Sequence, residues 1–378
     1  HSATRTSLAA VARLVLVAEC RFELSDDIYR YRWDGKVLAS GMNPYLHPPS
    51  HPVMDELRTG PLDGKINHPD ARTVYPPLAQ LVFAAGYLLD PGGIDGLRLL
   101  GLFAELLAWI VLLVHWRRGR LEGRSMLLVA LLPLVFLEGY LPGHVDVYAM
   151  VPLAAFLVLY ERGNMAAAAA MLALCVLVRP QYALLVPAAA FGTTPKKAAL
   201  GAVVFVAVVA AGYVPFLSAG VGLASSLLLM VRYWNFNGAV GWMLQQVLPE
   251  AVARGASFSL LAATTVASAW FWRKEPFRAM AVAFCLYAAF SPVVFPWYFV
   301  GASLLVAFRP VWALAWLLVS LPLAETVAIG WVLRHEWHLA WWVRALEYVP
   351  FFALFAAEPL WHRYAAGSKR REILPGVD

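Results

Sequence analysis

Ser25-Asp26-Asp27-Ile28-Tyr29-Arg30-Tyr31-Arg32-Trp33-Asp34-Gly35 is a polar block in a chain that is otherwise strongly apolar. It separates a first apolar stretch, residues 6–22, from a long series of further apolar stretches. Two adjacent acids stand near its start. Ionisable groups are costly to place where a membrane helix meets water, so their presence there favours a functional role.

Asp26 and Asp27 allow two interpretations. A carboxylate at the membrane boundary can serve as a general base between a lipid-borne substrate and an aqueous one, while its neighbour tunes charge or orientation. Alternatively, Ser25 and Asp26 only cap a helix that starts near Ile28. The residues themselves leave both interpretations open.

The composition indicates an integral membrane protein. Of the 378 residues, 61% are hydrophobic and 14% are charged, whereas a soluble domain carries about a quarter charged residues. The net charge of +6 does not indicate nucleic-acid binding, because the basic residues lie in short clusters between apolar runs. We therefore expect membrane lipids, and no nucleic acid, as partners.

A spanning helix needs about 20 largely apolar residues, and such windows recur along the chain. They cover residues 6–22, 97–116, 125–140, 145–161, 164–178, 181–194, 197–217, 252–272, 277–291, 297–308, 311–330 and 340–357. The basic clusters between them are Arg117-Arg118-Gly119-Arg120, Pro195-Lys196-Lys197, Arg273-Lys274 with Arg278, Arg309, and Lys369-Arg370-Arg371. Short basic loops stay cytoplasmic. We predict an all-α polytopic membrane protein of about twelve transmembrane helices in the cell inner (plasma) membrane.

This topology places two long segments, 23–96 and 218–250, on the extracytoplasmic side. Residues 75–90 are apolar, but counting them as a crossing inverts every later loop. We expect them to dip into or lie along the outer interface without crossing the membrane. A non-spanning backbone at membrane depth is tolerated where protein or a water-filled cavity covers it. Residues 1–378 then form a single transmembrane domain with a structured extracytoplasmic first loop containing juxtamembrane helices. One of these helices is expected at Ile28–Ser40 and ends before Gly41.

A second outer acid group comprises Glu138, His144 and Asp146 at the mouth of a predicted membrane helix. It could bind a sugar hydroxyl, an acceptor or a cation, because acids so close to apolar runs are unusual. The simpler interpretation is a helix N-terminus whose dipole Asp146 complements.

Two outer arginines run against the tendency of basic residues to stay inside the cell. Arg232 lies in an aromatic segment that also holds Asn235, and Arg179 ends an apolar run. A guanidinium binds phosphate through two parallel hydrogen bonds, so we expect Arg232 to bind a lipid-linked phosphate, with Arg179 as second candidate. The competing interpretation is that both side chains snorkel to the headgroups.

Aromatic residues could complete a sugar site. Trp297 and Tyr298 follow Phe295-Pro296 at an outer helix start and could stack on a sugar or belong to an interfacial belt. The spacing of His335, Glu336 and His338 is a weak metal pattern. The widely separated cysteines, Cys20, Cys175 and Cys285, indicate neither a disulfide framework nor a zinc site. No Gly-rich phosphate loop, H-E-x-x-H or G-x-S-x-G motif is present.

These residues together resemble the GT-C superfamily of membrane glycosyltransferases, in particular the bacterial polyprenyl-phosphate-mannose type. Lipid A aminoarabinose transferases of that superfamily carry D-E-x-R-Y after the first helix, and Asp27-Ile28-Tyr29-Arg30-Tyr31 keeps the Asp, Arg and Tyr. The alignment implies that Asp27 is the catalytic base and that Arg30 and Tyr31 belong to the site. The oligosaccharyltransferase pattern D-P-x-x-x-Y would favour Asp26 instead.

Two further elements follow the pattern. Tyr75-Pro76-Pro77-Leu78 resembles K-P-P-L, with Tyr75 where a phosphate-binding lysine is expected. This departure shifts the phosphate role to Arg72, Arg179 or Arg232. Gly143-His144-Val145-Asp146 is similar to the G-H-N-D element of bacterial mannosyltransferases of this class.

The resemblance implies inverting transfer of a sugar, most often mannose, from a polyprenyl-phosphate donor to an acceptor hydroxyl on the extracytoplasmic face. It implies no cofactor. Some members use a divalent cation, which Asp26, Asp27 and Asp146 could hold, but their number does not support one. The alternative hypothesis is a polytopic transporter or lipid flippase, for which about twelve helices and charged residues at membrane level also fit.

Overall fold

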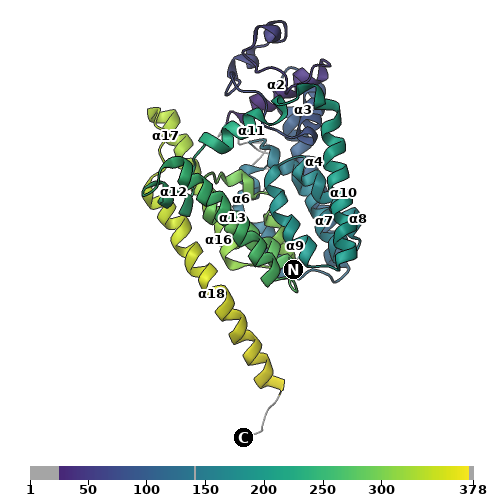
Figure 1. The fold of residues 1–378 in the computed structure, drawn as a ribbon, viewed down its shortest axis with the longest axis vertical. Coiled ribbons are helices and arrows are strands. Elements are labelled where there is room, and N and C mark those ends of the chain that lie inside the picture. Colours follow the sequence, from purple (N-terminus) through teal and green to yellow (C-terminus); the bar gives the residue numbers. More distant parts are fainter. Residues whose placement is uncertain (1–24, 140–141, 374–378) are drawn as a thin grey trace.

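The computed structural model describes residues 25–139 and 142–373 (Figure 1). The expected first helix at 6–22, with Cys20, lies outside the described residues, as do Tyr140 and Leu141. Within the described ranges all regular structure is helical, apart from isolated bridges that pair Phe236 and Asn237 with Val293. This confirms the all-α prediction.

Most helices follow one another with short connections, and the long exception is the segment between α2 and α3. The α-helices are α2 (Asp27–Ala39), α3 (Pro77–Leu89), α4 (Asp95–Arg117), α5 (Gly123–Leu131), α6 (Pro133–Glu138), α7 (Met150–Glu161), α8 (Met165–Val176), α9 (Val186–Phe191), α10 (Pro195–Tyr213), α11 (Gly222–Tyr233), α12 (Val240–Gln245), α13 (Glu250–Phe271), α14 (Pro276–Phe290), α15 (Ser303–Phe308), α16 (Trp312–Ser320), α17 (Thr326–Arg334) and α18 (Trp341–Ile373). The 3₁₀-helices are η1 (Pro52–Leu57), η2 (Pro61–Lys65), η3 (Val145–Ala149), η4 (Pro180–Leu185), η5 (Val214–Ala219), η6 (Pro296–Phe299) and η7 (Leu321–Glu325).

Most predicted membrane windows coincide with helix, but several are interrupted. The window 125–140 divides into α5 and α6 at Pro133, and 311–330 contains η7 between α16 and α17. Proline removes a backbone hydrogen bond and clashes with the preceding turn, which explains the break at Pro133. The segment 218–250 contains α11 and α12 and is therefore more ordered than the predicted loop.

Three helical stretches in the described residues are long and apolar enough to cross a membrane: Asp95–Arg117, Pro195–Ala219 and Trp312–Trp331. The outward surface of α10 supports this assignment, because Val203 is 68% and Val206 is 63% exposed. Exposed aliphatic side chains along a whole helix are stable in lipid and costly in water. The fold is that of a membrane protein, and the number of twelve crossings stays a prediction.

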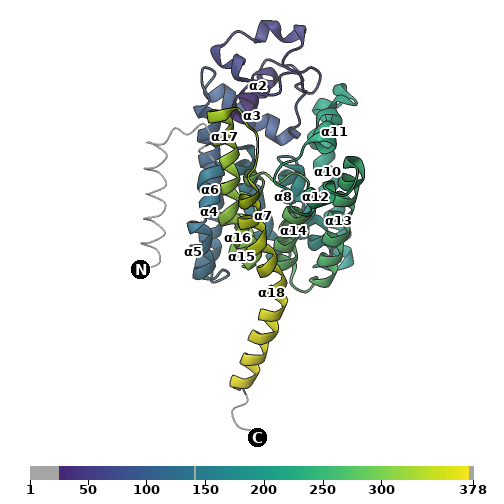
Figure 2. The same cartoon turned by 90° about the vertical axis from the view of Figure 1, so that its left-hand side faces the viewer.

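The segment between α2 and α3 folds over the helical body as a cap, drawn in purple and blue at the top of Figures 1 and 2. Helix α2 confirms the predicted Ile28–Ser40 helix within one residue, and Gly41 follows it with φ +83°. Arg30 and one ion-pair group hold the cap to α2. Arg30 pairs with Asp34 Oδ1 at 2.9 Å inside α2, and its guanidinium donates to the carbonyls of His68 and Ala71 in the cap. Asp63 accepts from Arg32 Nη1 at 2.8 Å and from Lys36 Nζ at 2.9 Å, so these charged residues are paired inside the cap.

Helix α3 fixes the position of α2. A Cβ on Gly35 would lie 2.2 Å from the carbonyl oxygen of Phe83, so the two helices touch backbone to backbone there. One turn earlier, the Tyr31 and Phe83 rings stack at 4.6 Å with an interplanar angle of 6°. Only glycine permits this approach.

Helix α3 has 13 residues and therefore measures about 20 Å. A bilayer core is about 30 Å thick. On its own α3 is too short to cross, and it packs along α2 and α4 next to the cap (Figure 2). The prediction that residues 75–90 do not cross the membrane is compatible with this length.

The turns that carry the basic clusters of the sequence lie together at the end of the molecule away from the cap. The contacts that join them are Lys197 Nζ to Gly163 O at 3.4 Å, Glu161 Oε2 to His115 Nε2 at 2.5 Å, the His115 and Phe308 rings at 5.8 Å, and Arg309 Nη2 to Glu275 Oε2 at 2.7 Å. The other end of α10 meets the cap, where Asn43 Nδ2 donates to Phe216 O at 3.2 Å. The protein thus has one basic end and one capped end.

The two ends should lie on opposite sides of the membrane. A single cysteine at Gly92, where a Cβ meets nothing within 4 Å, should react with an impermeant thiol reagent on intact cells. A single cysteine at Arg118, beyond the far end of α4, should not react until the cells are opened. Both variants need a background without Cys20, Cys175 and Cys285. Labelling of position 118 alone would place the cap in the cytoplasm.

The cap should lose stability in acid through Asp63. Burial acts to raise the pKa of Asp63, but hydrogen bonds from Lys36, Gly60 and Arg32 and the positive charge of Lys36 outweigh it, and the pKa is lowered. The carboxylate therefore stabilises the fold above its unfolded pKa of about 3.9 and loses this effect as pH falls through the lower folded value. Asp63→Asn should cost about 3 kcal/mol at pH 7. In thermal unfolding, the difference in stability between Asp63→Asn and wild type should disappear below about pH 4. A stability difference that does not change with pH would contradict the assignment.

Candidate functional site

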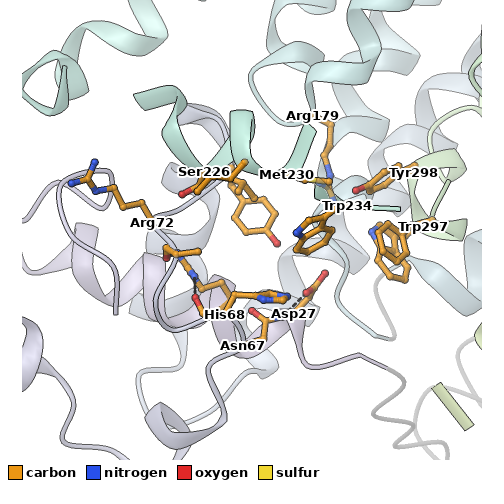
Figure 3. A pocket seen from close by; sticks show the side chains of 16 residues that line it. Asp27, Asn67, His68, Arg72, Arg179, Ser226, Met230, Trp234, Trp297 and Tyr298 are labelled. Carbon is orange, nitrogen blue, oxygen red and sulfur yellow. Dashed lines mark hydrogen bonds between the residues drawn. The ribbon is translucent and has the colours of Figure 1, made fainter. Parts of the chain in front are cut away.

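A cavity of about 110 Å³ lies where the cap meets α11 and the start of the helical body (Figure 3). Its wall is partly charged and partly aromatic. The lining residues are Asp27, Arg30, Asn67, His68, Ala71, Arg72, Val74, Tyr75, Arg179, Ser226, Leu229, Met230, Trp234, Phe295, Trp297 and Tyr298. Of the predicted site residues, Asp27, Arg30, Tyr75, Arg179, Trp297 and Tyr298 are brought together here.

Asp27 lies in the first turn of α2, where the helix dipole stabilises a carboxylate. Asn67 Nδ2 donates to Asp27 Oδ1 at 2.6 Å, and the Tyr31 hydroxyl donates to Oδ2 at 3.3 Å. Asp26 precedes the helix, is exposed, and accepts from the same Asn67 amide at 3.0 Å. Of the two acids, only Asp27 lines the cavity.

The Tyr31 hydroxyl is held as a donor to Asp27. Burial raises the pKa of Tyr31 well above its ordinary value, and the negative charge of Asp27 raises it further. Tyr31 packs edge to face on Tyr75 at 4.9 Å between ring centres. The carboxylate of Asp27 is therefore fixed at both oxygens, by one amide and one phenol.

A buried ion pair forms the opposite side of the cavity. Arg179 donates to Asp146 Oδ2 through Nε at 3.0 Å and is 2.8 Å from it through Nη2, and Asp146 is fully buried. Gln181 Nε2 donates to the second oxygen of Asp146 at 3.1 Å. Arg179 has an extended backbone immediately before Pro180, because a residue before proline avoids the helical region. This geometry turns the guanidinium away from α8 and into the cavity (Figure 3).

Aromatic rings connect the two charged groups. The Arg179 guanidinium carbon lies 4.8 Å from the ring centre of Tyr298 and 5.6 Å from that of Tyr75. Tyr75 contacts Tyr31, which donates to Asp27. Asp27, at the start of α2, and Asp146, in η3, are therefore linked through Tyr31, Tyr75 and Arg179.

A row of stacked rings forms a further wall. His144 stacks on Trp297 at 4.1 Å, Trp297 on Phe295 at 4.5 Å, and Phe295 on Phe236 at 4.4 Å. The backbone bridge between Phe236 and Val293 holds the last ring of the row in place. We call His144, Trp297, Phe295 and Phe236 the aromatic wall.

Two carboxylates, Glu138 and Glu325, lie near this wall. Glu138 is 1% exposed, its backbone carbonyl lies 3.1 Å from His144 Nδ1, and its Oε2 lies 3.4 Å from the same nitrogen. Neither of its carboxylate oxygens has a hydrogen-bond partner among the described residues. Glu325, at the end of η7, is close enough to Glu138 and Asp27 to interact with both charges. His144 Nε2 and Trp297 Nε1 are also buried without a hydrogen-bond partner among the described residues.

Some predicted site residues lie outside the cavity or use their polar groups for other contacts. Arg232 is exposed, stacks over Tyr233 and does not line the cavity. Asn235 is exposed and accepts from Arg254 at 3.0 Å. Arg30 lines the cavity, but its guanidinium donates to Asp34 and to the carbonyls of His68 and Ala71, so it holds the cap in shape. Arg72 lines the cavity, and its guanidinium points away from the centre (Figure 3).

Sequence reasoning missed Asn67, His68, Trp234 and Glu325. His68 has φ +44°, a costly conformation for a non-glycine residue, and its ring lies 5.0 Å from Trp234 on the other side of the cavity opening. Asn67 follows Asp27 by 40 residues. No short motif links such distant positions.

Metal binding has no geometric support in the described part of the chain. Groups of three or more His, Cys, Asp or Glu placed to hold an ion are absent there. His335, Glu336 and His338, whose spacing is only a weak metal pattern, are exposed, and Glu336 pairs with Arg334 at 3.0 Å.

Comparisons with known proteins identify a similar solved structure. No family model and no curated protein matches the chain. The crystal structure of ArnT from Cupriavidus metallidurans bound to undecaprenyl phosphate is similar over 94% of this chain and 72% of that chain, with a TM-score of 0.49 and 18% sequence identity. A role for this chain therefore has to be derived from its own cavity.

The ion pair at the cavity should be essential for folding. Asp146→Asn removes the only carboxylate within contact of Arg179 among the described residues and leaves a buried cation. Breaking a buried pair in this way costs about 3–5 kcal/mol. Thermal unfolding of the purified variant should report this loss, whereas Asp26→Asn, at an exposed position, should unfold like wild type. Equal stability of Asp146→Asn and wild type would show that Arg179 has another partner.

Proposed function

We propose that this chain is a membrane glycosyltransferase of the GT-C type, which transfers a sugar from a polyprenyl-phosphate donor to an acceptor hydroxyl. The observation that carries the proposal is that one cavity at the capped end contains both a fixed carboxylate, Asp27, and a buried guanidinium, Arg179 (Figure 3). A glycosyl transfer from a phosphate needs these two groups, a base for the acceptor and a cation for the leaving phosphate.

The proposed reaction is a single displacement. Asp27 takes the proton of the acceptor hydroxyl, and the oxygen attacks the anomeric carbon. The bond from that carbon to the phosphate oxygen breaks, and its electron pair leaves with polyprenyl phosphate. Attack from the face opposite the phosphate inverts the anomeric centre. Asn67 and Tyr31 support the step by holding the two oxygens of Asp27 in position.

Arg179 is the proposed phosphate ligand, in preference to Arg232. Its Nε and Nη2 contact Asp146, which leaves Nη1 to donate to a phosphate oxygen. Asp146 and Gln181 orient the guanidinium, and the low polarity of the surrounding rings strengthens its interaction with a developing negative charge. Tyr75, in the place of the expected lysine, lies beside Arg179 and supports it through its ring face.

The sugar is proposed to lie against the aromatic wall. Trp297 and Tyr298 line the cavity, and Trp297 Nε1 is a buried donor without a partner among the described residues. Glu138 and His144 add unpaired polar atoms beside it. Buried polar groups without partners favour a polar ligand, such as a sugar or an acceptor hydroxyl. Mannose is the sugar we propose, from the motif resemblance.

The lipid tail is proposed to leave the cavity along α11. Leu229 and Met230 line the cavity, and Leu229 is 52% exposed on the outside of the protein. Because the basic turns lie at the other end of the molecule, the site is proposed to face the extracytoplasmic side of the plasma membrane.

Asp27→Asn should abolish transfer while the protein still folds, because the amide keeps the size of the side chain and loses its basicity. General-base catalysis contributes about 10²–10⁴ in rate. Turnover of a radiolabelled polyprenyl-phosphate mannose, measured as released polyprenyl phosphate, should fall at least about 100-fold. Asp26→Asn is the matched control and should keep turnover within a few-fold. Undiminished turnover in Asp27→Asn would remove it as the base, and failure of wild type to release polyprenyl phosphate would favour the transporter or flippase.

Arg179→Lys should weaken donor binding about tenfold, because lysine keeps the charge beside Asp146 but loses one charge-assisted hydrogen bond, worth about 1.5–3 kcal/mol. Direct binding of polyprenyl phosphate to purified protein measures the effect. Arg232→Lys, on the exposed face of α11, should bind as wild type does. A loss in Arg232→Lys with none in Arg179→Lys would assign the phosphate to α11 instead.

A further inference from the structure

A second cavity, of about 320 Å³, lies between α7, α8, α9 and α10 and shares no lining residue with the first. We call it the α8–α10 groove. Its wall is almost entirely apolar. The lining residues are Phe156, Tyr160, Met165, Ala168, Ala169, Leu172, Val186, Ala189, Ala190, Thr193, Lys197, Ala198, Gly201, Ala202, Phe205 and Val206.

Small side chains create the groove. A Cβ on Gly201 would lie 3.5 Å from the Cβ of Ala169, so α8 and α10 touch there at van der Waals distance. Ala168 and Ala202 flank this contact without filling the space beside it. The one phenol in the wall, Tyr160, donates to Ala189 O at 3.2 Å, so its polar atom is already paired. The interior therefore suits a hydrocarbon chain.

Positive charge stands at one end of the groove. Lys197 lines it, is exposed, and contacts only the carbonyl of Gly163 at 3.4 Å among the described residues. Lys196 and Arg162, both exposed, are adjacent in sequence to Lys197 and Gly163. An apolar slot with a cationic mouth is complementary to a lipid with an anionic headgroup.

The depth of the groove matches one leaflet. From Lys197 to Val206 on α10 is nine residues, or about 14 Å, which is about half of a bilayer core of about 30 Å. Lys197 lies near the start of α10, at the basic end, and the far end of α10 meets the cap through Phe216. Val206 is 63% exposed, so the groove opens sideways toward lipid. The charged mouth and the apolar slot are thus arranged like the headgroup and one chain of a phospholipid in the leaflet opposite the cap.

We propose that the α8–α10 groove binds an anionic glycerophospholipid from that leaflet, with one acyl chain in the groove and the phosphate on Lys197, assisted by Lys196 and Arg162. This site is separate from the cavity of Asp27 and Arg179 and does not depend on the glycosyltransferase proposal. Polyprenyl phosphate offers the same phosphate chemistry, but its proposed site lies at the capped end, on the other side of the membrane.

The test uses the full-length protein, delipidated in detergent, and native mass spectrometry with two lipids of identical acyl chains, phosphatidylglycerol and phosphatidylcholine. Wild type should bind phosphatidylglycerol at least tenfold more tightly. A lysine near a phosphate contributes about a fivefold change in affinity, so Lys196→Gln/Lys197→Gln should weaken phosphatidylglycerol binding about 25-fold. Lys274→Gln, an exposed lysine at the same basic end, is the matched control and should change nothing.

A second pair of variants tests the groove itself. Gly201→Leu extends a side chain into the slot and should weaken both lipids, whereas Gly201→Ala, whose Cβ fits at ordinary contact distance, should bind as wild type. Thermal unfolding verifies that all variants fold. Equal binding of the two lipids by wild type, unchanged binding in the double lysine variant, or displacement of phosphatidylglycerol by an equimolar amount of polyprenyl phosphate would overturn the proposal. None of these outcomes depends on catalytic turnover or on Asp27.

Discussion

The buried pair of Arg179 and Asp146 is the interaction on which the rest of the site depends. A charge taken out of water costs several kcal/mol unless a partner and further hydrogen bonds compensate it. Asp146 supplies that partner at 2.8 Å, and Gln181 completes it. This ion pair holds the start of η3 against the end of α8. It also positions the Arg179 guanidinium beside the rings of Tyr75 and Tyr298.

The cap completes the site from the opposite side. Close packing at Gly35 sets α2 on α3. The ion pairs of Asp63 and the hydrogen bonds from Arg30 to the carbonyls of His68 and Ala71 fold the following segment back over α2. Asn67 is thereby brought to Asp27 from 40 residues away. Asp27 belongs to a charged network in the cap, and Arg179 belongs to another in the helical body. The two networks meet where Tyr31 packs on Tyr75, so the carboxylate and the guanidinium share one cavity.

The local features of this site follow from the sequence, and its long-range contacts do not. The end of helix α2 follows from Gly41, which adopts a positive φ after the helix, and a short motif is enough to single out Asp27 as a candidate base. Aromatic neighbours in sequence favour Arg232 as phosphate ligand, but the sequence does not show which face of α11 packs inward, and Arg232 is exposed outside the cavity. Asn67, His68 and Glu325 carry no local signal, since loops and distant helices bring them to the cavity. Membrane windows were recognised by hydropathy, but breaks such as the one at Pro133 made their number unpredictable.

The most direct measurement is a structure of the protein with a non-hydrolysable polyprenyl-phosphate sugar. The account predicts that the phosphate lies within hydrogen-bond distance of Arg179, that the sugar rests against Trp297, and that its anomeric carbon faces Asp27. A phosphate bound at Arg232, on the outer face of α11, or at the basic end of the molecule would contradict it.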